Sequence, residues 1–278
     1  MPVSQPSLWD NAALESGYRS MTDLKLEEAV QYFNEALQVG FGERETTQEA
    51  VDACQYWQPR IKKNVEINTL AITDFLTDYR QYSFTRLMTG LKKSLLSYIV
   101  DCMSQYAHLN WDEMEIAFDL LLKMKDYQKA ESFISLLISQ NIEKRYLLYF
   151  LAQAQWLNGH TATSNDNYIL ALLHQPDKSF IERIENKKLQ SLINSYGPAM
   201  APAYCLLFGI VPVVPVVNNI EFRDEEHAKA IRSLHLLRET NKALVNNDRA
   251  SIINSRKQLK AENPALYGAY FNVLKQNK

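Results

Sequence analysis

Residues 145–178 constrain the fold most, because they have the pattern of two antiparallel helices joined by a tight turn. The segment reads RYLLYFLAQAQWLNGHTATSNDNYILALLHQPDK, with a turn at Asn158 and Gly159 and a stop at Pro176. The apolar positions of both halves recur at the three- and four-residue spacing of a helix that packs on one side. A single helical hairpin cannot bury that side alone, so the segment predicts an array of hairpins.

Helical periodicity extends over nearly the whole chain. Only 8 Gly and 9 Pro occur in 278 residues, which is too few for the many tight turns of an all-β protein. Gly40 predicts the end of one helix, Asp248 the N-cap of another and Pro264 the first turn of the last. Like Pro264, Pro59 predicts the first turn of a helix. Residues 178–195 are predicted to form one further helix. The chain is therefore predicted to be all-α.

The segment 145–178 resembles a tetratricopeptide repeat, a 34-residue unit of two antiparallel helices. That family favours small residues at unit positions 8, 20 and 27 and an aromatic residue at position 24. With Ala152 at position 8, Tyr168 falls at position 24 and Ala171 at position 27, while Ser164 stands where alanine is usual. The resemblance implies a hairpin whose two helices approach closely at these positions.

Two more segments, 10–43 and 111–144, fit the same unit, whereas 44–110 fits it poorly. In the first segment the favoured positions 8, 20, 24 and 27 are occupied by Gly17, Ala29, Phe33 and Ala36. We interpret 44–110 either as hairpins that have lost the motif or as an insertion of long helices. The resemblance implies an α-solenoid of antiparallel helical hairpins over residues 1–195. An irregular C-terminal helical part, 196–278, would pack on the solenoid or cap it.

Composition and missing motifs argue against several functions. The net charge is −2, with 30 basic and 32 acidic residues, and long basic clusters typical of nucleic-acid binding are absent from the sequence. Cys54, Cys102 and Cys205 are few and widely spaced, so we expect neither a disulfide framework nor a zinc site. The N-terminus has no signal-peptide pattern, and nucleotide-binding and hydrolase motifs are lacking. These features predict a cytoplasmic protein that is not an enzyme and has no cofactor.

The segment 197–217 is uncharged and approaches the length of a membrane span. Its four prolines remove backbone donors and interrupt a helix, so we expect a short helix over 201–208 followed by an extended stretch. A membrane partner is accordingly not expected, although docking of this segment on a bilayer remains an alternative.

The resemblance also implies a partner-binding groove. In tetratricopeptide arrays the first helix of each unit lines the concave face, mainly through unit positions 2, 5, 9 and 12. In the units 111–144 and 145–178 the corresponding residues with acidic or aromatic side chains, together with one glutamine, are Asp112, Glu115, Asp119, Tyr146, Tyr149, Gln153 and Trp156. Acids beside aromatics suit a peptide that carries Lys or Arg between apolar anchors. An opposing interpretation is that the acids favour a helix N-terminus and that the aromatics are buried.

The sequence thus predicts a non-catalytic scaffold or adaptor that binds a protein or peptide. One alternative is a membrane-peripheral adaptor that docks through 197–217. A second alternative is an enzyme whose site is assembled from scattered residues, because function belongs to sites and not to folds.

Overall fold

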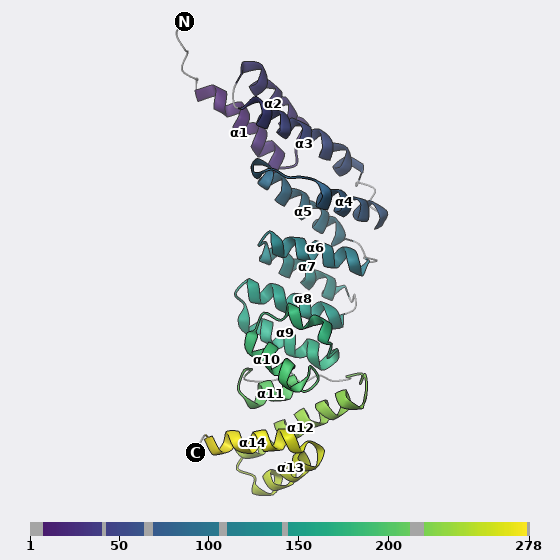
Figure 1. Ribbon diagram of the computed structural model, residues 1–278, viewed down its shortest axis with the longest axis vertical. Helices are drawn as coiled ribbons and strands as arrows, with labels where there is room; N and C mark the ends of the chain where they lie inside the picture. Colours follow the sequence, from purple (N-terminus) through teal and green to yellow (C-terminus); the bar gives the residue numbers. More distant parts are fainter. Residues whose placement is uncertain are drawn as a thin grey trace. The chain divides into compact units, whose positions relative to one another are not determined.

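The computed structural model describes residues 8–40, 43–63, 69–105, 110–140, 144–211 and 220–276. Within these ranges every regular element is a helix, which confirms the all-α prediction (Figure 1). The α-helices are α1 (Leu8–Thr22), α2 (Leu26–Val39), α3 (Arg44–Lys63), α4 (Thr69–Gln81), α5 (Thr89–Met103), α6 (Trp111–Lys123), α7 (Tyr127–Ser139), α8 (Lys144–Leu157), α9 (Thr161–His174), α10 (Lys187–Tyr196), α11 (Ala201–Leu207), α12 (Glu225–Val245), α13 (Arg249–Glu262) and α14 (Pro264–Gln276). Two short 3-10 helices are η1 (Arg86–Met88) and η2 (Lys178–Arg183).

The chain divides into two compact units, Met1–Lys129 and Ala130–Lys278. This boundary lies inside α7. The division at 195/196 that the sequence suggested stays a prediction. Helices α8 and α9 share one apolar core with α10 to α14, so the C-terminal helices pack directly on the hairpin that resembles the repeat. The solenoid arrangement itself stays a prediction.

Among the described residues, four pairs of consecutive helices are joined by the same three-residue turn, whose middle residue adopts positive φ. These middle residues are Leu24, Lys125, Gly159 and Asn247, with φ of 58°, 59°, 89° and 53°. In each turn the residue after the middle one donates its N–H to a carbonyl five residues earlier, as His160 does to Gln155 at 2.8 Å. The middle residue donates a second bond, and together the two satisfy carbonyls at the end of the first helix. The recurrence shows that one local structure is used in both units.

In the first unit, α1 and α2 meet at the positions that the repeat motif reserves for close approach. A Cβ atom added to Gly17 would lie 2.6 Å from Cε1 of Phe33, which is closer than any real contact. Phe33 is fully buried and its ring meets Tyr18 edge-on. The glycine is therefore required by packing, since it lets the Phe33 ring lie against the α1 backbone.

In the second unit, Ser164 explains the departure from the repeat motif. Its side chain is fully buried, and Oγ donates a 2.7 Å hydrogen bond to the carbonyl of Ala152 on the facing helix. A small hydroxyl can therefore replace alanine at this position, because its polar atom has a partner. Tyr168 and Ala171 are also fully buried, as the motif requires.

Several helix boundaries agree with the sequence. Gly40 ends α2 with φ of 80°, Asp248 caps α13 by accepting the N–H of Ser251, and Pro264 opens α14. The short helix expected over 201–208 is α11, whereas the stretch after Val211 lies outside the described residues until Ile220.

Two boundary predictions were wrong. Pro59 lies inside α3 and does not begin a helix. The proline nitrogen has no N–H to donate to the carbonyl of Gln55, so α3 lacks one backbone hydrogen bond there. Residues 178–195 form two elements, η2 and α10, because Ile184 turns into the core and Asn186 caps α10.

Candidate functional site

The predicted acidic residues of the first unit lie along α6. Asn110 caps this helix by accepting the N–H of Asp112, whose side chain is exposed. Glu115 and Asp119 follow at helical spacing and are half-buried. We call Asp112, Glu115 and Asp119 the acidic face of α6. Their role in binding a partner stays a prediction.

A buried carboxylate, which sequence reasoning missed, links α6 to α4. The side chain of Glu113 is only 5% exposed, and its Oε1 accepts a hydrogen bond from the hydroxyl of Thr73. Its Oε2 is buried and has no hydrogen-bond partner among the described residues. This contact sets α4 against α6, and the next residue of α4, Asp74, is exposed. Two helices that carry acidic residues therefore lie side by side in the first unit.

A cleft of about 400 Å³ opens between α3 and α4 in the same unit. Its wall is partly apolar, and its charged groups are two carboxylates and one guanidinium. The lining residues are Pro59, Arg60, Ala71, Asp74, Phe75, Thr77 and Asp78. Because these residues come from two helices that the sequence did not match to the repeat, no motif pointed to them.

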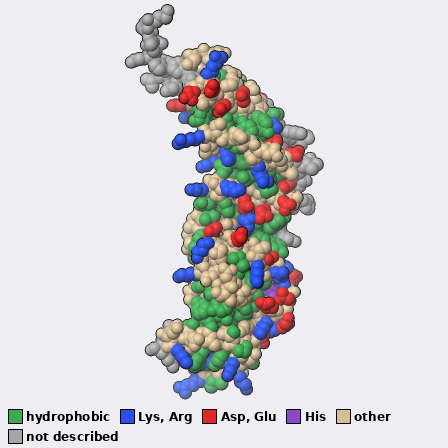
Figure 2. All heavy atoms as spheres, in the orientation of Figure 1, with side chains coloured by type: hydrophobic (Ala, Val, Ile, Leu, Met, Phe, Trp, Pro, Cys, Tyr) green, Lys and Arg blue, Asp and Glu red, His purple; other side chains and the backbone are tan. Residues whose placement is uncertain are grey.

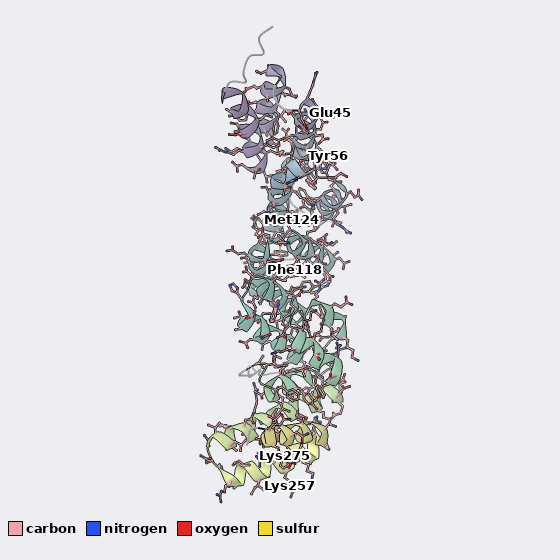
Figure 3. The ribbon with its side chains drawn as sticks, turned by 60° about the vertical axis from the view of Figure 1, so that its left-hand side comes forward. Glu45, Tyr56, Phe118, Met124, Lys257 and Lys275 are labelled. Carbon is pink, nitrogen blue, oxygen red and sulfur yellow. The ribbon has the colours of Figure 1, made fainter. Side chains whose placement is uncertain are left out.

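The guanidinium of Arg60 shows how this cleft holds a cation. Its Nε lies 2.6 Å from Oδ2 of Asp78, and Nη1 donates to the carbonyl of Tyr56 at 2.7 Å. The guanidinium carbon lies 3.5 Å from the centre of the Tyr56 ring, which is labelled in Figure 3. Stacking and ion pairing thus act on the same group.

In the second unit, the predicted groove position Tyr149 is occupied by the chain itself. Phe180 of η2 stacks on Tyr149 with ring centres 4.8 Å apart and planes inclined by 7°. The Tyr149 hydroxyl donates to the carbonyl of Gln175 at 2.6 Å, and burial raises the pKa of this phenol. Tyr149 is fully buried, so it offers no surface to a ligand in this conformation.

Gln153 is likewise bonded to the segment that follows Pro176. Its side-chain nitrogen donates to Glu185 at 3.0 Å, and its oxygen accepts a longer bond of 3.4 Å from Arg183. Tyr146 and Trp156, the other two aromatic positions, are half-buried, and the Tyr146 ring lies 5.4 Å from the ring of Phe180. The surface of α8 that was predicted to form a groove is therefore covered in large part by η2.

Another cleft, of about 470 Å³, lies between α12 and α13. Its lining is mostly polar and includes His235, Glu239 and Lys242. The enzyme alternative stays a prediction that this cleft does not test.

The cysteines are not arranged for nucleophilic chemistry. All three are buried, and burial raises the pKa of the Cys54 and Cys205 thiols to about 12. Burial also raises the pKa of Cys102. Among the described residues no group of three or more His, Cys, Asp or Glu side chains could hold a metal ion. None of the described helices has the length and apolar character needed to cross a membrane.

The chain matches no protein-family model, no curated protein and no solved structure. The resemblance to tetratricopeptide repeats therefore stays a prediction that rests on the hairpins described above.

Proposed function

We propose that the chain is a non-catalytic scaffold that binds a protein segment or peptide carrying Lys or Arg. The observation that carries the proposal is the recurring turn between consecutive helices, which has one backbone structure at four places in the described chain. Repeated hairpins form surfaces from many helix faces, and such surfaces serve extended partners better than small substrates.

The chemistry of the partner follows from the first unit. The acidic face of α6 and the exposed Asp74 of α4 provide carboxylates, and the cleft beside α4 adds an apolar wall around Phe75. A Lys or Arg side chain can pack its stem on such a wall while its charge meets a carboxylate. Arg60 shows a related arrangement within the chain, since its guanidinium stacks on the Tyr56 ring and pairs with Asp78.

The second unit supports the proposal less directly, because η2 covers α8. We therefore place the binding surface in the first unit and assign Tyr149 and Gln153 a role in packing. Trp156 and Tyr146 stay candidate contacts, since both are half-buried and not fully covered.

A peptide-display selection on the full chain tests the proposal. We expect the recovered peptides to be enriched in Lys and Arg flanked by apolar residues, and to bind less well to the variant Asp112→Asn/Glu115→Gln/Asp119→Asn. A matched control is Glu28→Gln/Glu35→Gln/Glu45→Gln, which removes the same charge from exposed positions on α2 and α3. Peptides without basic residues, or equal loss of binding in both variants, would contradict the proposal.

A further inference from the structure

The C-terminal hairpin formed by α13 and α14 is strongly basic, although the whole chain has a net charge of −2. Among residues 249–276 the sequence contains one acidic residue, Glu262, and its carboxylate pairs with Arg232 of α12 at 2.9 Å. The basic residues of this range are Arg249, Arg256, Lys257, Lys260 and Lys275. Lys and Arg side chains gather over these helices in Figure 2, at the end of the second unit.

One face of α13 combines these cations with an exposed aliphatic residue. Arg249, Ile253, Lys257 and Lys260 follow one another at steps of four, four and three residues, which places them on one side of the helix. The three cations are exposed, and Ile253 is 68% exposed. An exposed branched apolar side chain surrounded by cations is typical of protein surfaces that bind a partner with both apolar and anionic groups.

The face continues onto α14 through contacts between cations and aromatic rings. Nζ of Lys260 lies 6.0 Å from the centre of the Tyr267 ring, and that ring stacks on Phe271 at 6.3 Å. Nζ of Lys275 lies 4.9 Å from the centre of the Phe271 ring, which is 42% exposed. Figure 3 labels Lys257 on α13 and Lys275 on α14. We call the basic face the set Arg249, Ile253, Lys257, Lys260, Tyr267, Phe271 and Lys275.

We propose that the basic face docks on an anionic lipid bilayer. Long cationic side chains reach lipid phosphates and carboxylates without a fixed pairing pattern, and Ile253 and Phe271 enter the boundary between headgroups and acyl chains. This site is distinct from 197–217, where the sequence placed the membrane alternative. The basic face also lies outside the first unit. Membrane docking would therefore be a second property of the proposed scaffold, independent of the peptide that the first unit binds.

A nucleic acid fits the basic face less well than a bilayer does. Single-stranded nucleic acids stack their bases on open aromatic rings. Here Lys260 lies over Tyr267 and Lys275 lies over Phe271, so lysines already occupy a face of each ring. A phosphate backbone also offers no apolar group for the exposed Ile253 to contact, whereas the acyl chains of a bilayer do.

Vesicle flotation of the full chain tests the inference. We expect the protein to float with vesicles of phosphatidylcholine and phosphatidylserine, to stay behind with phosphatidylcholine alone, and to dissociate at high salt. The variant Lys257→Gln/Lys260→Gln/Lys275→Gln should weaken binding about a hundredfold, because each basic residue near an anionic surface contributes roughly fivefold. The variant Ile253→Ser should weaken binding even at low salt.

A matched control removes three exposed cations from the first unit, in the variant Arg80→Gln/Lys93→Gln/Lys123→Gln. It has the same net charge as the first triple variant and should bind vesicles as the unmodified chain does. Circular dichroism must show the same helix content for all variants. No binding to phosphatidylserine vesicles, equal losses in the two triple variants, or tighter binding of a single-stranded RNA oligonucleotide through the same three lysines would overturn the inference.

Discussion

The ring of Phe180 lies flat against the ring of Tyr149, and this contact closes the surface of α8 that the repeat motif would leave open. The same phenylalanine also meets Phe150 edge-on at 6.1 Å. A 3-10 helix that follows the hairpin therefore supplies the covering that a further repeat would otherwise provide.

Replacing Phe180 with alanine should destabilise the second unit. We expect the free energy of unfolding to fall by about 2–3 kcal/mol, because a half-buried aromatic side chain and its stacking are lost. Urea denaturation followed by circular dichroism measures the loss. Phe222→Ala serves as a control, since Phe222 is 57% exposed and should cost less than about 1 kcal/mol. A loss for Phe180→Ala no larger than for the control would show that η2 does not hold α8.

Close packing of α1 on α2 predicts opposite effects of two glycine substitutions. Gly17→Ala should destabilise by about 1–3 kcal/mol, because the new methyl group would overlap the ring of Phe33. Gly268→Ala in α14 should stabilise by roughly 0.5–1 kcal/mol, since no atom lies within 4 Å of the added Cβ and alanine favours a helix. Thermal unfolding of the two variants tests this, and equal effects would refute the packing account.

The shared hairpin turn makes a prediction about residues at positive φ. Lys125 has φ of 59°, a conformation that costs a residue with a Cβ roughly 1 kcal/mol relative to glycine. Lys125→Gly should therefore stabilise the turn by up to about that amount. Gly159→Ala should destabilise it by about 1 kcal/mol or more, because Gly159 has φ of 89°. Melting temperatures that move in the same direction for both variants would argue against a common turn.

Buried His227 predicts a loss of stability in mild acid. Its Nε2 donates to the carbonyl of Leu173 at 2.9 Å, while Nδ1 accepts the N–H of Arg223, so both ring nitrogens are used by the neutral form. Burial is the main cause that lowers its pKa below 6.5. The unfolded state then binds more protons, so stability should fall as the pH drops below about 6.5 toward the folded-state pKa.

Urea denaturation at about pH 7.5 and about pH 5.5 measures this effect on both sides of the ordinary histidine pKa. His227→Gln should reduce the difference between the two conditions. A smaller dependence should remain, because burial also lowers the pKa of His174. An unchanged pH dependence in the variant would show that His227 does not titrate in this range.

Local signals made parts of the fold predictable. Three helix boundaries were predicted correctly from single residues, namely Gly40, Asp248 and Pro264. Each of these residues acts through the backbone conformation of one helical turn, which the local sequence specifies. The prediction from Pro59 was wrong because the sequence alone does not distinguish a proline that opens a helix from one that a longer helix contains. The cover over α8 could not be foreseen, because Phe180 reaches Tyr149 through a contact across 31 residues.

The candidate surfaces were predictable to different degrees. The residues of the acidic face of α6 were named from the resemblance to the repeat, whereas the cleft beside Asp74 joins two helices that no motif connects. The basic face was missed because its charges are spread over α13 and α14 and form no long run. Two sets of four-residue steps, Arg249, Ile253 and Lys257 before Pro264 and Tyr267, Phe271 and Lys275 after it, were the signal that could have indicated it.

The most direct test of the proposed scaffold is a calorimetric titration of the full chain with a basic peptide recovered by display. The account predicts that Asp112→Asn/Glu115→Gln/Asp119→Asn weakens binding at least tenfold, because a hydrogen bond to a charged group contributes about 1.5–3 kcal/mol. The control Glu28→Gln/Glu35→Gln/Glu45→Gln should bind within about twofold of the unmodified chain, since distant surface charges are screened by salt. Equal affinity of all three proteins would contradict the claim that the acidic face of α6 binds the partner.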